Sequence, residues 1–268
     1  MLTVFNKIVF QEFKDLFKDY LHVKGLYKGQ LECLVCGGRP HRFHKLYDYY
    51  FEQLDKFECV HSIFTAETFN FLQYYCIRCH ANDRDRLYAL FLKEKLAKTD
   101  QSVRFKFIDF APSGVSAFIK SHPFVEYRSA DLNGKADDLI DITDMPAYAS
   151  DSVDAFLCSH VLEHVTDDIK AMRELYRILK PGGWGICMVP IFLNLDAVLE
   201  NPAWTSEADR WKYYCQDDHV RQYSKQGFVD RLRQASFKVL QLGIDHFGSA
   251  VFKKNGIHPR SVLYVVSK

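Results

Sequence analysis

Two pairs of cysteines have the spacing of a metal site. "CLVC" places Cys33 and Cys36 three positions apart, and "CIRC" repeats this spacing at Cys76 and Cys79. Four thiolates in two such pairs can close a tetrahedron around Zn²⁺, and a site closed by four protein ligands is structural rather than catalytic. Reduced core cysteines are the alternative, but paired cysteines without a secretory signal favour metal. Three side chains could replace one of the four ligands: Cys59, His61 and His80.

The stretch "KFIDFAPSG" (106–114) has the layout of a strand that runs into a nucleotide-binding turn. Asp109 ends the predicted strand, and the turn Ala111-Pro112-Ser113-Gly114 contains one glycine. Asp131 follows at about 20 positions, the spacing at which a carboxylate binds a ribose diol. A pyrophosphate needs the close backbone approach that several glycines allow. The pattern therefore predicts a site for a nucleoside with a small charged tail rather than for a dinucleotide.

Residues 139–190 narrow the identity of that nucleoside. They contain "LIDI", "CSHVLEHV" and "LKPGG", and the stretch resembles the class I S-adenosylmethionine-dependent methyltransferases. In that family an acid after the third strand lies near the adenine, and the end of the fourth strand lines the methionine end of the cofactor. The resemblance implies S-adenosylmethionine as cofactor and a Rossmann-like sheet, mostly parallel with an antiparallel edge. The implied cofactor-binding residues are Asp109, Ala111, Pro112, Ser113, Gly114, Asp131, Asp141, Ile142, Ser159 and His160.

Several residues in this region also have a purely structural explanation. Asp141 could be a turn residue, and Glu163 or His164 could cap a helix that begins nearby. His160 is the better candidate for contact with the cofactor, because it directly follows the predicted fourth strand.

The resemblance extends to a bacterial subgroup whose members carry an N-terminal double Cys-x-x-C module. "IDFAPSG" is similar to the "HIAPE" turn of that subgroup, and "DDHVRQY" (217–223) is similar to its Asp-His-Val-Arg-x-Tyr element. The chain departs from the subgroup at Asp109 and Ser113, where the subgroup has His and Glu, and at Ser224, where it has Gly. Relatives often belong to surface-polysaccharide pathways, which implies a sugar, nucleotide-sugar or related small metabolite as acceptor.

The segment at about 191–225 is expected to form a lid over the acceptor. If the acceptor is a hydroxyl, a base must remove its proton, and histidine is the best-matched side chain near neutral pH. We therefore predict His219 as the base, Asp218 as the group that orients its imidazole, and Arg221 as a fork for an anionic group. The alternative is an ionic brace made by these same residues. Trp204 and Trp211 are expected to pack inside the lid rather than to stack on a sugar.

The predicted elements divide the chain into three regions. Residues 1–24 form an amphipathic helix, expected to dock on the core or on a second copy, with membrane attachment as the alternative. Residues 25–82 form the zinc module, and residues 83–268 alternate strands and helices as a methyltransferase domain. Strands are expected at about 104–110, 125–129, 153–158, 184–191, 237–244 and 261–268, and helices at about 83–98, 115–121 and 166–179. The apolar residues of the first helix are Phe5, Ile8, Val9, Phe13, Leu16, Phe17, Tyr20 and Leu21.

Composition limits the classes of function. The 268 residues are 48% hydrophobic and 26% charged, which is typical of a soluble globular protein. A net charge of +1 gives no electrostatic reason to expect nucleic acid or an anionic membrane as partner. No stretch could span a bilayer and no secretory signal is present, so we expect a cytoplasmic enzyme with a small-molecule acceptor.

Two other functions stay open at this point. In the first, the zinc module grips a protein or RNA substrate, which a basic face around residues 39–45 would favour. In the second, the chain is a non-catalytic scaffold, because the turn at Asp109 to Ser113 is altered.

Overall fold

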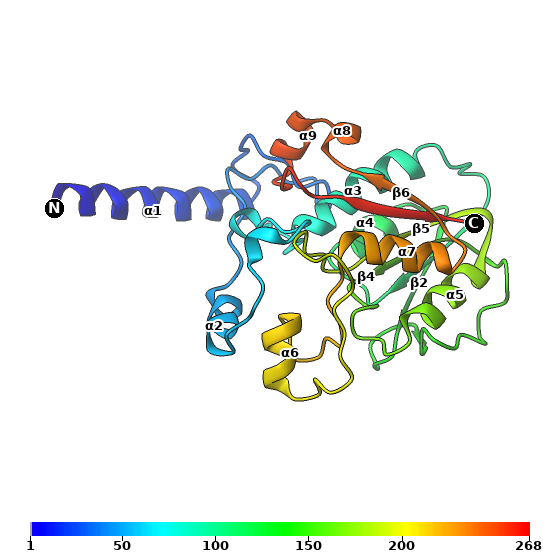
Figure 1. Cartoon of the computed structure of the whole chain (residues 1–268). Helices are drawn as coiled ribbons and strands as arrows, with labels where there is room; N and C mark the ends of the chain where they lie inside the picture. The colour runs from blue at the N-terminus through cyan, green and yellow to red at the C-terminus, as the bar shows by residue number, and fades with distance from the viewer. Residues whose placement is uncertain (1) are drawn as a thin grey trace.

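A computed structural model of the chain describes residues 2–268, with side chains from Gln11 onward. Its centre is a seven-stranded sheet in the order β3-β2-β1-β4-β5-β7-β6 (Figure 1). β3, β2, β1, β4 and β5 run parallel, and β7 is antiparallel to both β5 and β6. The predicted fold class, a mostly parallel sheet with an antiparallel edge, is confirmed. The strands are β1 (Phe105–Phe110), β2 (Val125–Asp131), β3 (Asp138–Leu139), β4 (Val153–Ser159), β5 (Leu179–Met188), β6 (Lys238–Leu242) and β7 (Leu263–Ser267).

The central strands are apolar on both sides because helices cover both faces of the sheet. On one face, Phe91 of α3 meets Trp184 of β5 at a ring separation of 5.2 Å. On the other, Phe237 contacts both Phe156 of β4 and Tyr176 of α5. The helices are α1 (Leu2–Val23), α2 (Asp48–Lys56), α3 (Asp83–Leu96), α4 (Ser116–Lys120), α5 (Asp168–Ile178), α6 (Glu207–Tyr214), α7 (Lys225–Gln234), α8 (Ile244–Phe247) and α9 (Ser249–Lys254), with short 3₁₀ turns at Ile63–Thr65 and Phe71–Gln73.

Local sequence signals explain where the helices that support the site begin. Asn82 and Asp85 form a reciprocal capping box at the start of α3. Asp167 caps α5 and Ser224 caps α7, each by accepting a backbone N–H. The cap of α5 is therefore neither Glu163 nor His164. The helix predicted at about 166–179 ends at Ile178, and β5 then runs through Pro181, so this strand begins earlier than the predicted 184–191.

The segment between the two cysteine pairs packs against the lid. Phe57, just after α2, stacks on Trp211 of α6 with rings 3° from parallel, and the amide of Val60 donates to the carbonyl of Lys212 at 3.0 Å. Ala66 forms a β-bridge with Phe192. Residues 25–82 thus hold the cysteines and also pack against the lid, in the lower part of the molecule in Figure 1.

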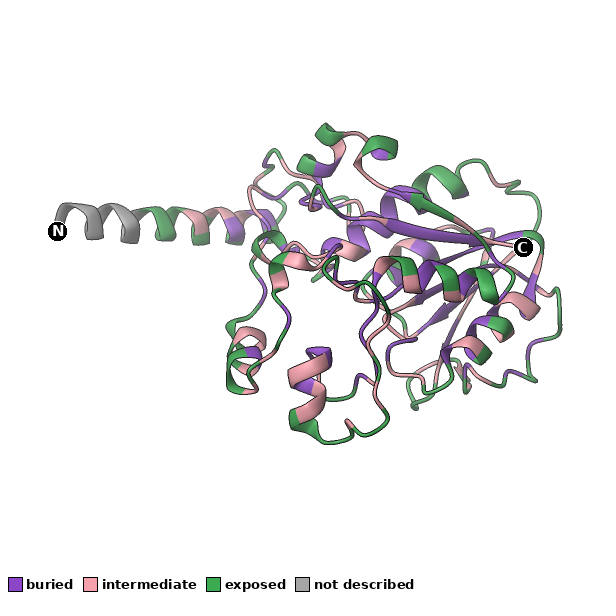
Figure 2. Ribbon diagram, in the orientation of Figure 1, coloured by how far each residue is buried: buried purple, intermediate pink, exposed green. Residues whose placement is uncertain are grey.

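Helix α1 projects from the body of the protein (Figure 1). Only its C-terminal end is fastened: Asp19 is buried and accepts hydrogen bonds from Arg42 and His44. Phe13 is 66% exposed and Leu16 is 62% exposed. The coloured part of α1 is mostly exposed or intermediate (Figure 2). The exposed side chains of Phe13, Leu16 and Phe17 do not dock on the protein's own core, and docking on a second copy stays a prediction. The predicted apolar residues Phe5, Ile8 and Val9 lie outside the described side chains.

Candidate active site and metal centre

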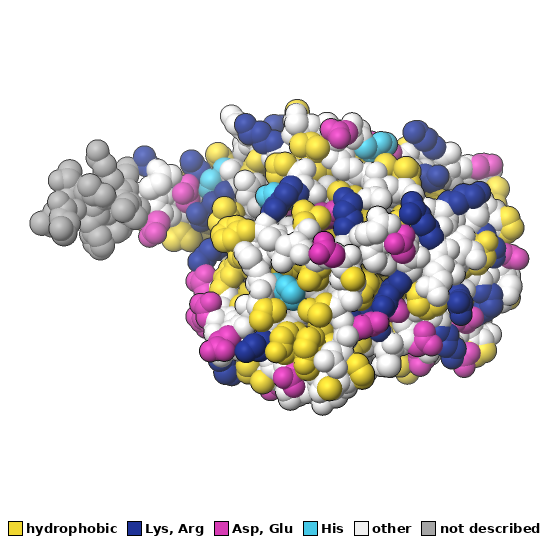
Figure 3. Space-filling model, in the orientation of Figure 1, with side chains coloured by type: hydrophobic (Ala, Val, Ile, Leu, Met, Phe, Trp, Pro, Cys, Tyr) yellow, Lys and Arg dark blue, Asp and Glu magenta, His cyan; other side chains and the backbone are white. Residues whose placement is uncertain are grey.

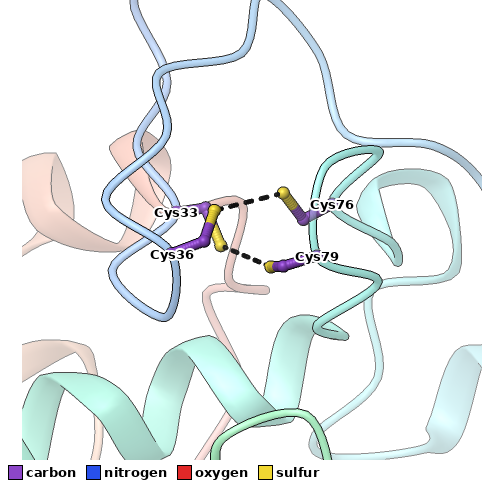
Figure 4. A group of neighbouring side chains, drawn as sticks. All are labelled: Cys33, Cys36, Cys76 and Cys79. Carbon is purple, nitrogen blue, oxygen red and sulfur yellow. Dashed lines mark hydrogen bonds between the residues drawn. The ribbon is translucent and has the colours of Figure 1, made fainter. Parts of the chain in front are cut away.

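The four cysteines of the predicted zinc site come together. Cys33 Sγ lies 3.7 Å from Cys79 Sγ, and Cys36 Sγ lies 3.9 Å from Cys76 Sγ (Figure 4). Zn–S bonds of about 2.3 Å place the sulfurs of a tetrahedral site about 3.8 Å apart. All four sulfurs lie within 4.8 Å of one another, so the cluster could hold zinc.

The two cysteine pairs have matching backbone geometry. The amide of Cys33 donates to the carbonyl of Gly38, and the amide of Cys76 donates to that of Ala81. The residue after the second cysteine of each pair has positive φ: Gly37 at 67° and His80 at 58°. His80 adopts a conformation that costs a residue with a Cβ about 1–2 kcal/mol. The positive φ of His80 thus shapes the backbone of the second cysteine pair around the sulfurs.

Half of the ten predicted cofactor residues line a cavity of about 700 Å³ at the carboxyl ends of β1, β2 and β4. In open α/β sheets ligands bind at this edge, because the loops after the strands diverge there. Five predicted residues line the cavity: Ala111, Asp131, Asp141, Ile142 and His160. Ala111 and His160 both have positive φ, at 53° and 56°, so the chain turns sharply at the ends of β1 and β4.

Asp141 shapes a turn and also lies on the wall of the cavity. Its Oδ1 accepts hydrogen bonds from the amide and the hydroxyl of Thr143, both at 2.8 Å, which shapes a turn. These hydrogen bonds lower the pKa of Asp141. The same residue is exposed on the cavity wall, so the turn presents it to the cavity.

The other five predicted cofactor residues are not part of the cavity wall: Asp109, Pro112, Ser113, Gly114 and Ser159. Asp109 is buried and accepts hydrogen bonds from Ser116 Oγ at 2.6 Å and Tyr127 Oη at 2.8 Å. Burial raises its pKa to about 6 against the effect of these bonds. Ser113 Oγ donates to Asp85, and Ser159 Oγ pairs with the hydroxyl of Tyr88. Through these hydrogen bonds, the segments that follow β1 and β4 are fixed to α3 and α4.

The single glycine of the turn is required by a close approach. A Cβ on Gly114 would lie 2.7 Å from Asp85 Oδ2 and 3.1 Å from the Cα of Ala81. The turn therefore packs directly on the start of α3. Glycine is needed here for contact with the protein itself, which is why a turn poor in glycine can still border a ligand cavity.

A second cavity, of about 370 Å³, adjoins the first. His160 and His164 line both of them. The second cavity is walled by the segment between the cysteine pairs (Tyr50, Phe69), by the residues after β5 (Ile191), and by the lid (His219). Hydrophobic side chains also gather on this face, where α2 and α6 lie (Figure 3). We refer to the two spaces as the cofactor cavity and the acceptor cavity.

His219 lies buried in the wall of the acceptor cavity. Its Nδ1 is 3.0 Å from the carbonyl oxygen of Tyr214, so Nδ1 carries the proton and donates to that oxygen. The other nitrogen, Nε2, lies 4.0 Å from Oε1 of Glu163. Burial lowers the pKa of His219, while the Glu163 carboxylate raises it in part. His219 is therefore a neutral imidazole with a free lone pair at neutral pH.

Glu163 is the residue whose importance the sequence did not indicate. It is fully buried, and its Oε1 lies 3.0 Å from Nδ1 of His160. Arg84 donates to Nε2 of the same imidazole at 2.7 Å, which leaves the proton of neutral His160 on Nδ1, facing Glu163. Burial opposes ionisation of Glu163, yet the contacts with His160 and His219 bring its pKa below the usual range. Only packing reveals this, since "LEH" reads equally well as the start of a helix.

Asp218 and Arg221 do not take the positions predicted for them. Asp218 Oδ2 lies 3.2 Å from Nδ1 of His164, so the Tyr214 carbonyl, not Asp218, orients His219. Arg221 is buried and donates to the carbonyls of Leu162, Val165 and Thr166 and to Glu200. These groups of the protein use the donors of its guanidinium, as expected for the alternative in which Arg221 belongs to an ionic brace. The lid is thereby tied to the loop that follows β4.

Most of the basic stretch that would favour an RNA substrate is paired with acidic side chains. Arg42 and His44 contact Asp19 of α1, and Lys45 pairs with Asp48 at 2.6 Å. The two tryptophans of the lid pack as predicted: Trp204 stacks on Tyr213 at a ring separation of 3.7 Å. Within residues 2–268, no helix combines the length and apolarity required to cross a membrane.

Comparison with known proteins gives a family match in the parallel part of the sheet. Residues 120–187 match the family model described as "Methyltransferase domain". This stretch contains β2, the loop with Asp141, the end of β4 with His160, and most of β5. This part of the chain is therefore similar to methyltransferase domains. The sheet, with the antiparallel β7 between β5 and β6, has a Rossmann-like methyltransferase fold.

The named relatives are distant from this chain in sequence. A ubiquinone/menaquinone biosynthesis C-methyltransferase UbiE from Nitrobacter hamburgensis is 27% identical over 146 residues, which covers 48% of this chain and 52% of the relative. The chain thus spans about half the length of the curated relative it matches. A methyltransferase structure from Archaeoglobus fulgidus is 13% identical, with coverage of 82% and 100% and a TM-score of 0.44. A complex of the Haloferax volcanii Trm112 methyltransferase activator with a methyltransferase gives 17% identity, coverage of 69% and 93%, and a TM-score of 0.41.

Proposed function

We propose that the chain transfers a methyl group from S-adenosylmethionine to a hydroxyl oxygen of a sugar, nucleotide-sugar or related small metabolite. One observation carries this proposal: the cofactor cavity and the acceptor cavity meet at His160 and His164. Two substrates bound in these spaces would have their reacting groups at the shared wall. Methyl transfer requires such alignment, because the acceptor atom has to lie in line with the C–S bond.

The cofactor cavity supplies groups suited to a nucleoside. Asp131, at the end of β2, faces the cavity with a carboxylate that can accept both hydroxyls of a ribose. Ile142 and Val161 provide apolar surface for a base. The cofactor would supply the electrophilic methyl group, and the chain's own residues would hold and orient it.

The acceptor cavity supplies a base for a hydroxyl. In the proposed step, the acceptor O–H bond breaks and its proton goes to Nε2 of His219. The acceptor oxygen forms a bond to the methyl carbon as the sulfonium C–S bond breaks. Glu163, 4.0 Å from Nε2, stabilises the imidazolium that results. The buried position of both groups strengthens their interaction, since little water screens it.

A structural zinc ion is part of the proposal. The sulfur separations of 3.7 and 3.9 Å support it. The ion would tie residues 33–36 to residues 76–79, directly before α3 and the wall of the acceptor cavity. Thiolates have to stay reduced to bind zinc, which supports a cytoplasmic location.

Transfer to carbon is a second candidate, favoured by the relative named as a C-methyltransferase. The aromatic wall of Tyr50, Phe69 and Phe192 would suit a ring as acceptor. NMR of a product made with ¹³C-methyl cofactor separates the two, because a methyl on oxygen resonates far downfield of a methyl on carbon.

The cofactor test is a thermal-shift titration with S-adenosylhomocysteine, with NAD as unrelated nucleotide. A ligand at 100 times its Kd stabilises the folded state by about 2.7 kcal/mol. We expect a dose-dependent rise in Tm with S-adenosylhomocysteine and none with NAD. The absence of a shift with S-adenosylhomocysteine would refute the enzymatic function and favour the scaffold.

A further inference from the structure

Arg84 is the only Lys or Arg side chain in the wall of the acceptor cavity, within the described part of the chain. It belongs to the first turn of α3. One nitrogen, Nη1, donates to Nε2 of His160 at 2.7 Å. The other, Nη2, donates to the hydroxyl of Tyr74 at 3.1 Å. The guanidinium carries more donors than these two contacts use, and its side chain borders the open cavity.

Both partners of Arg84 are neutral at physiological pH. Burial, followed by the Arg84 charge, lowers the pKa of His160 to about 4. Burial raises the pKa of Tyr74 to about 12, so its phenol stays protonated. A permanent cation in a buried wall is costly unless an anion accompanies it.

The carboxylates nearest to Arg84 face other partners. Asp83 accepts from the amide of Asn70, and Asp85 accepts from the amide of Asn82 and from Ser113. Glu163 lies on the far side of the His160 ring, 3.0 Å from its Nδ1. Among side chains 11–268, no carboxylate comes within ion-pair distance of the Arg84 guanidinium.

We propose that Arg84 binds a carboxylate of the ligand in the acceptor cavity. A planar guanidinium matches a planar carboxylate with two parallel hydrogen bonds, which favours this group as the missing anion. The inference rests on the proposed methyl transfer and narrows its acceptor to an acidic metabolite, such as a sugar acid.

The carboxylate has two possible sources. Arg84 borders the acceptor cavity and is absent from the wall of the cofactor cavity, which points to the acceptor. His160, its partner, borders both, so the methionine tail of the cofactor is the other source. The chemistry recognised is the same in each case, and the experiment separates them.

The test compares Arg84→Gln with wild type, Arg84→Lys and the control Arg104→Gln. The control removes an exposed charge that belongs to neither cavity wall. Dissociation constants are measured for S-adenosylhomocysteine and for 5′-methylthioadenosine, which lacks the carboxylate. Stabilisation by D-glucuronate is compared with that by D-glucose, with and without S-adenosylhomocysteine. Unchanged binding of 5′-methylthioadenosine shows that Arg84→Gln is folded.

If the acceptor supplies the carboxylate, glucuronate stabilises wild type more than glucose does, and Arg84→Gln loses this preference at unchanged affinity for S-adenosylhomocysteine. If the cofactor supplies it, Arg84→Gln weakens S-adenosylhomocysteine binding by about tenfold or more and leaves 5′-methylthioadenosine unaffected. Arg84→Lys should recover part of either loss. Two results would overturn the proposal. In the first, Arg84→Gln keeps both the affinity for S-adenosylhomocysteine and the preference for glucuronate. In the second, wild type shows no preference for glucuronate and Arg84→Gln binds S-adenosylhomocysteine as wild type does. Wild type that fails to bind S-adenosylhomocysteine would instead refute the proposed function.

Discussion

Four side chains form a continuous line across the junction of the two cavities: Arg84, His160, Glu163 and His219. The line runs from a cation, through a neutral imidazole, to a buried carboxylate and a second imidazole. The His160 ring separates the Arg84 cation from the Glu163 carboxylate. Each charge can therefore interact with a group of a ligand bound at its own end of the line. Under the proposed function, proton transfer takes place at one end and ligand binding at the other.

Replacement of Glu163 by Gln tests the proton-transfer end. The carboxylate raises the pKa of His219, which burial lowers, so its removal should lower that pKa further. The activity of wild type is lost as pH falls through the pKa of His219, because protonation removes the base. In Glu163→Gln this acidic limb should move to lower pH, and the plateau rate should fall because the imidazolium is no longer stabilised.

The measurement is a pH profile of kcat/KM for wild type, Glu163→Gln and His219→Gln. We expect His219→Gln to lose about 10²- to 10⁴-fold in rate, the usual contribution of a general base, with cofactor affinity unchanged. A limb that moves to higher pH in Glu163→Gln, or full turnover in His219→Gln, would show that another group takes the proton.

Asp131→Ala tests the ribose contact. Loss of charge-assisted hydrogen bonds should weaken S-adenosylhomocysteine binding about tenfold or more. Glu126→Ala is the matched control, because Glu126 is an exposed carboxylate on the same strand. Isothermal titration gives both affinities, and equal values for the two variants would place the ribose elsewhere.

At the scale of elements, the two cysteine pairs come together directly before α3. Metal analysis of the purified protein should give about one zinc per chain, and Cys33→Ser should lose it together with several degrees of Tm, since metal binding adds to folding free energy. Cys59→Ser is the control, because Cys59 lies outside the cluster and contacts Cys215 instead. Retention of zinc by Cys33→Ser would contradict a four-cysteine site.

Helix α1 carries an apolar stripe that nothing in the described chain covers. Phe13 and Phe17 are exposed, and the polar positions beside them carry both signs of charge, unlike the basic helices that bind anionic membranes. We expect a second copy to cover the stripe. Phe13→Ser with Phe17→Ser should convert a dimer into a monomer in light scattering at unchanged Tm, whereas Glu12→Ser should leave the dimer intact. A monomeric wild type would contradict this prediction.

At the scale of the whole molecule, the acceptor cavity exists only because the cysteine-flanked segment and the lid pack together. Trp211 is 6% exposed and contacts both Tyr50 and Phe57. Trp211→Ala should cost about 3–5 kcal/mol of unfolding free energy, as truncation of a buried aromatic does, and Trp211→Phe should cost less.

The same variant separates the two cavities. The cofactor cavity is built from β1, β2 and β4, with no contribution from Trp211. Folded Trp211→Ala should therefore bind S-adenosylhomocysteine as wild type does and lose acceptor turnover. Urea unfolding and cofactor titration measure the two effects, and a parallel loss of cofactor affinity would show that the cavities are not independent.

The sequence alone determined the alternation of strands and helices, the strand that ends at Asp131, and the two cysteine pairs. These features depend on local patterns: hydrophobic periodicity, helix caps and short spacings along the chain. The two lid tryptophans also pack against other aromatic rings, as the sequence predicted.

Only the tertiary structure decided which polar residues share a site. Glu163 and His219 are far apart along the chain, as are Arg84 and His160, and no short pattern connects them. Asp218 and His219 are neighbours in sequence, yet their side chains turn to different partners. Arg221 has the composition of an anion fork, but nearby carbonyls occupy its donors. Side-chain direction and burial decide between a site and a brace, and both are set by long-range packing.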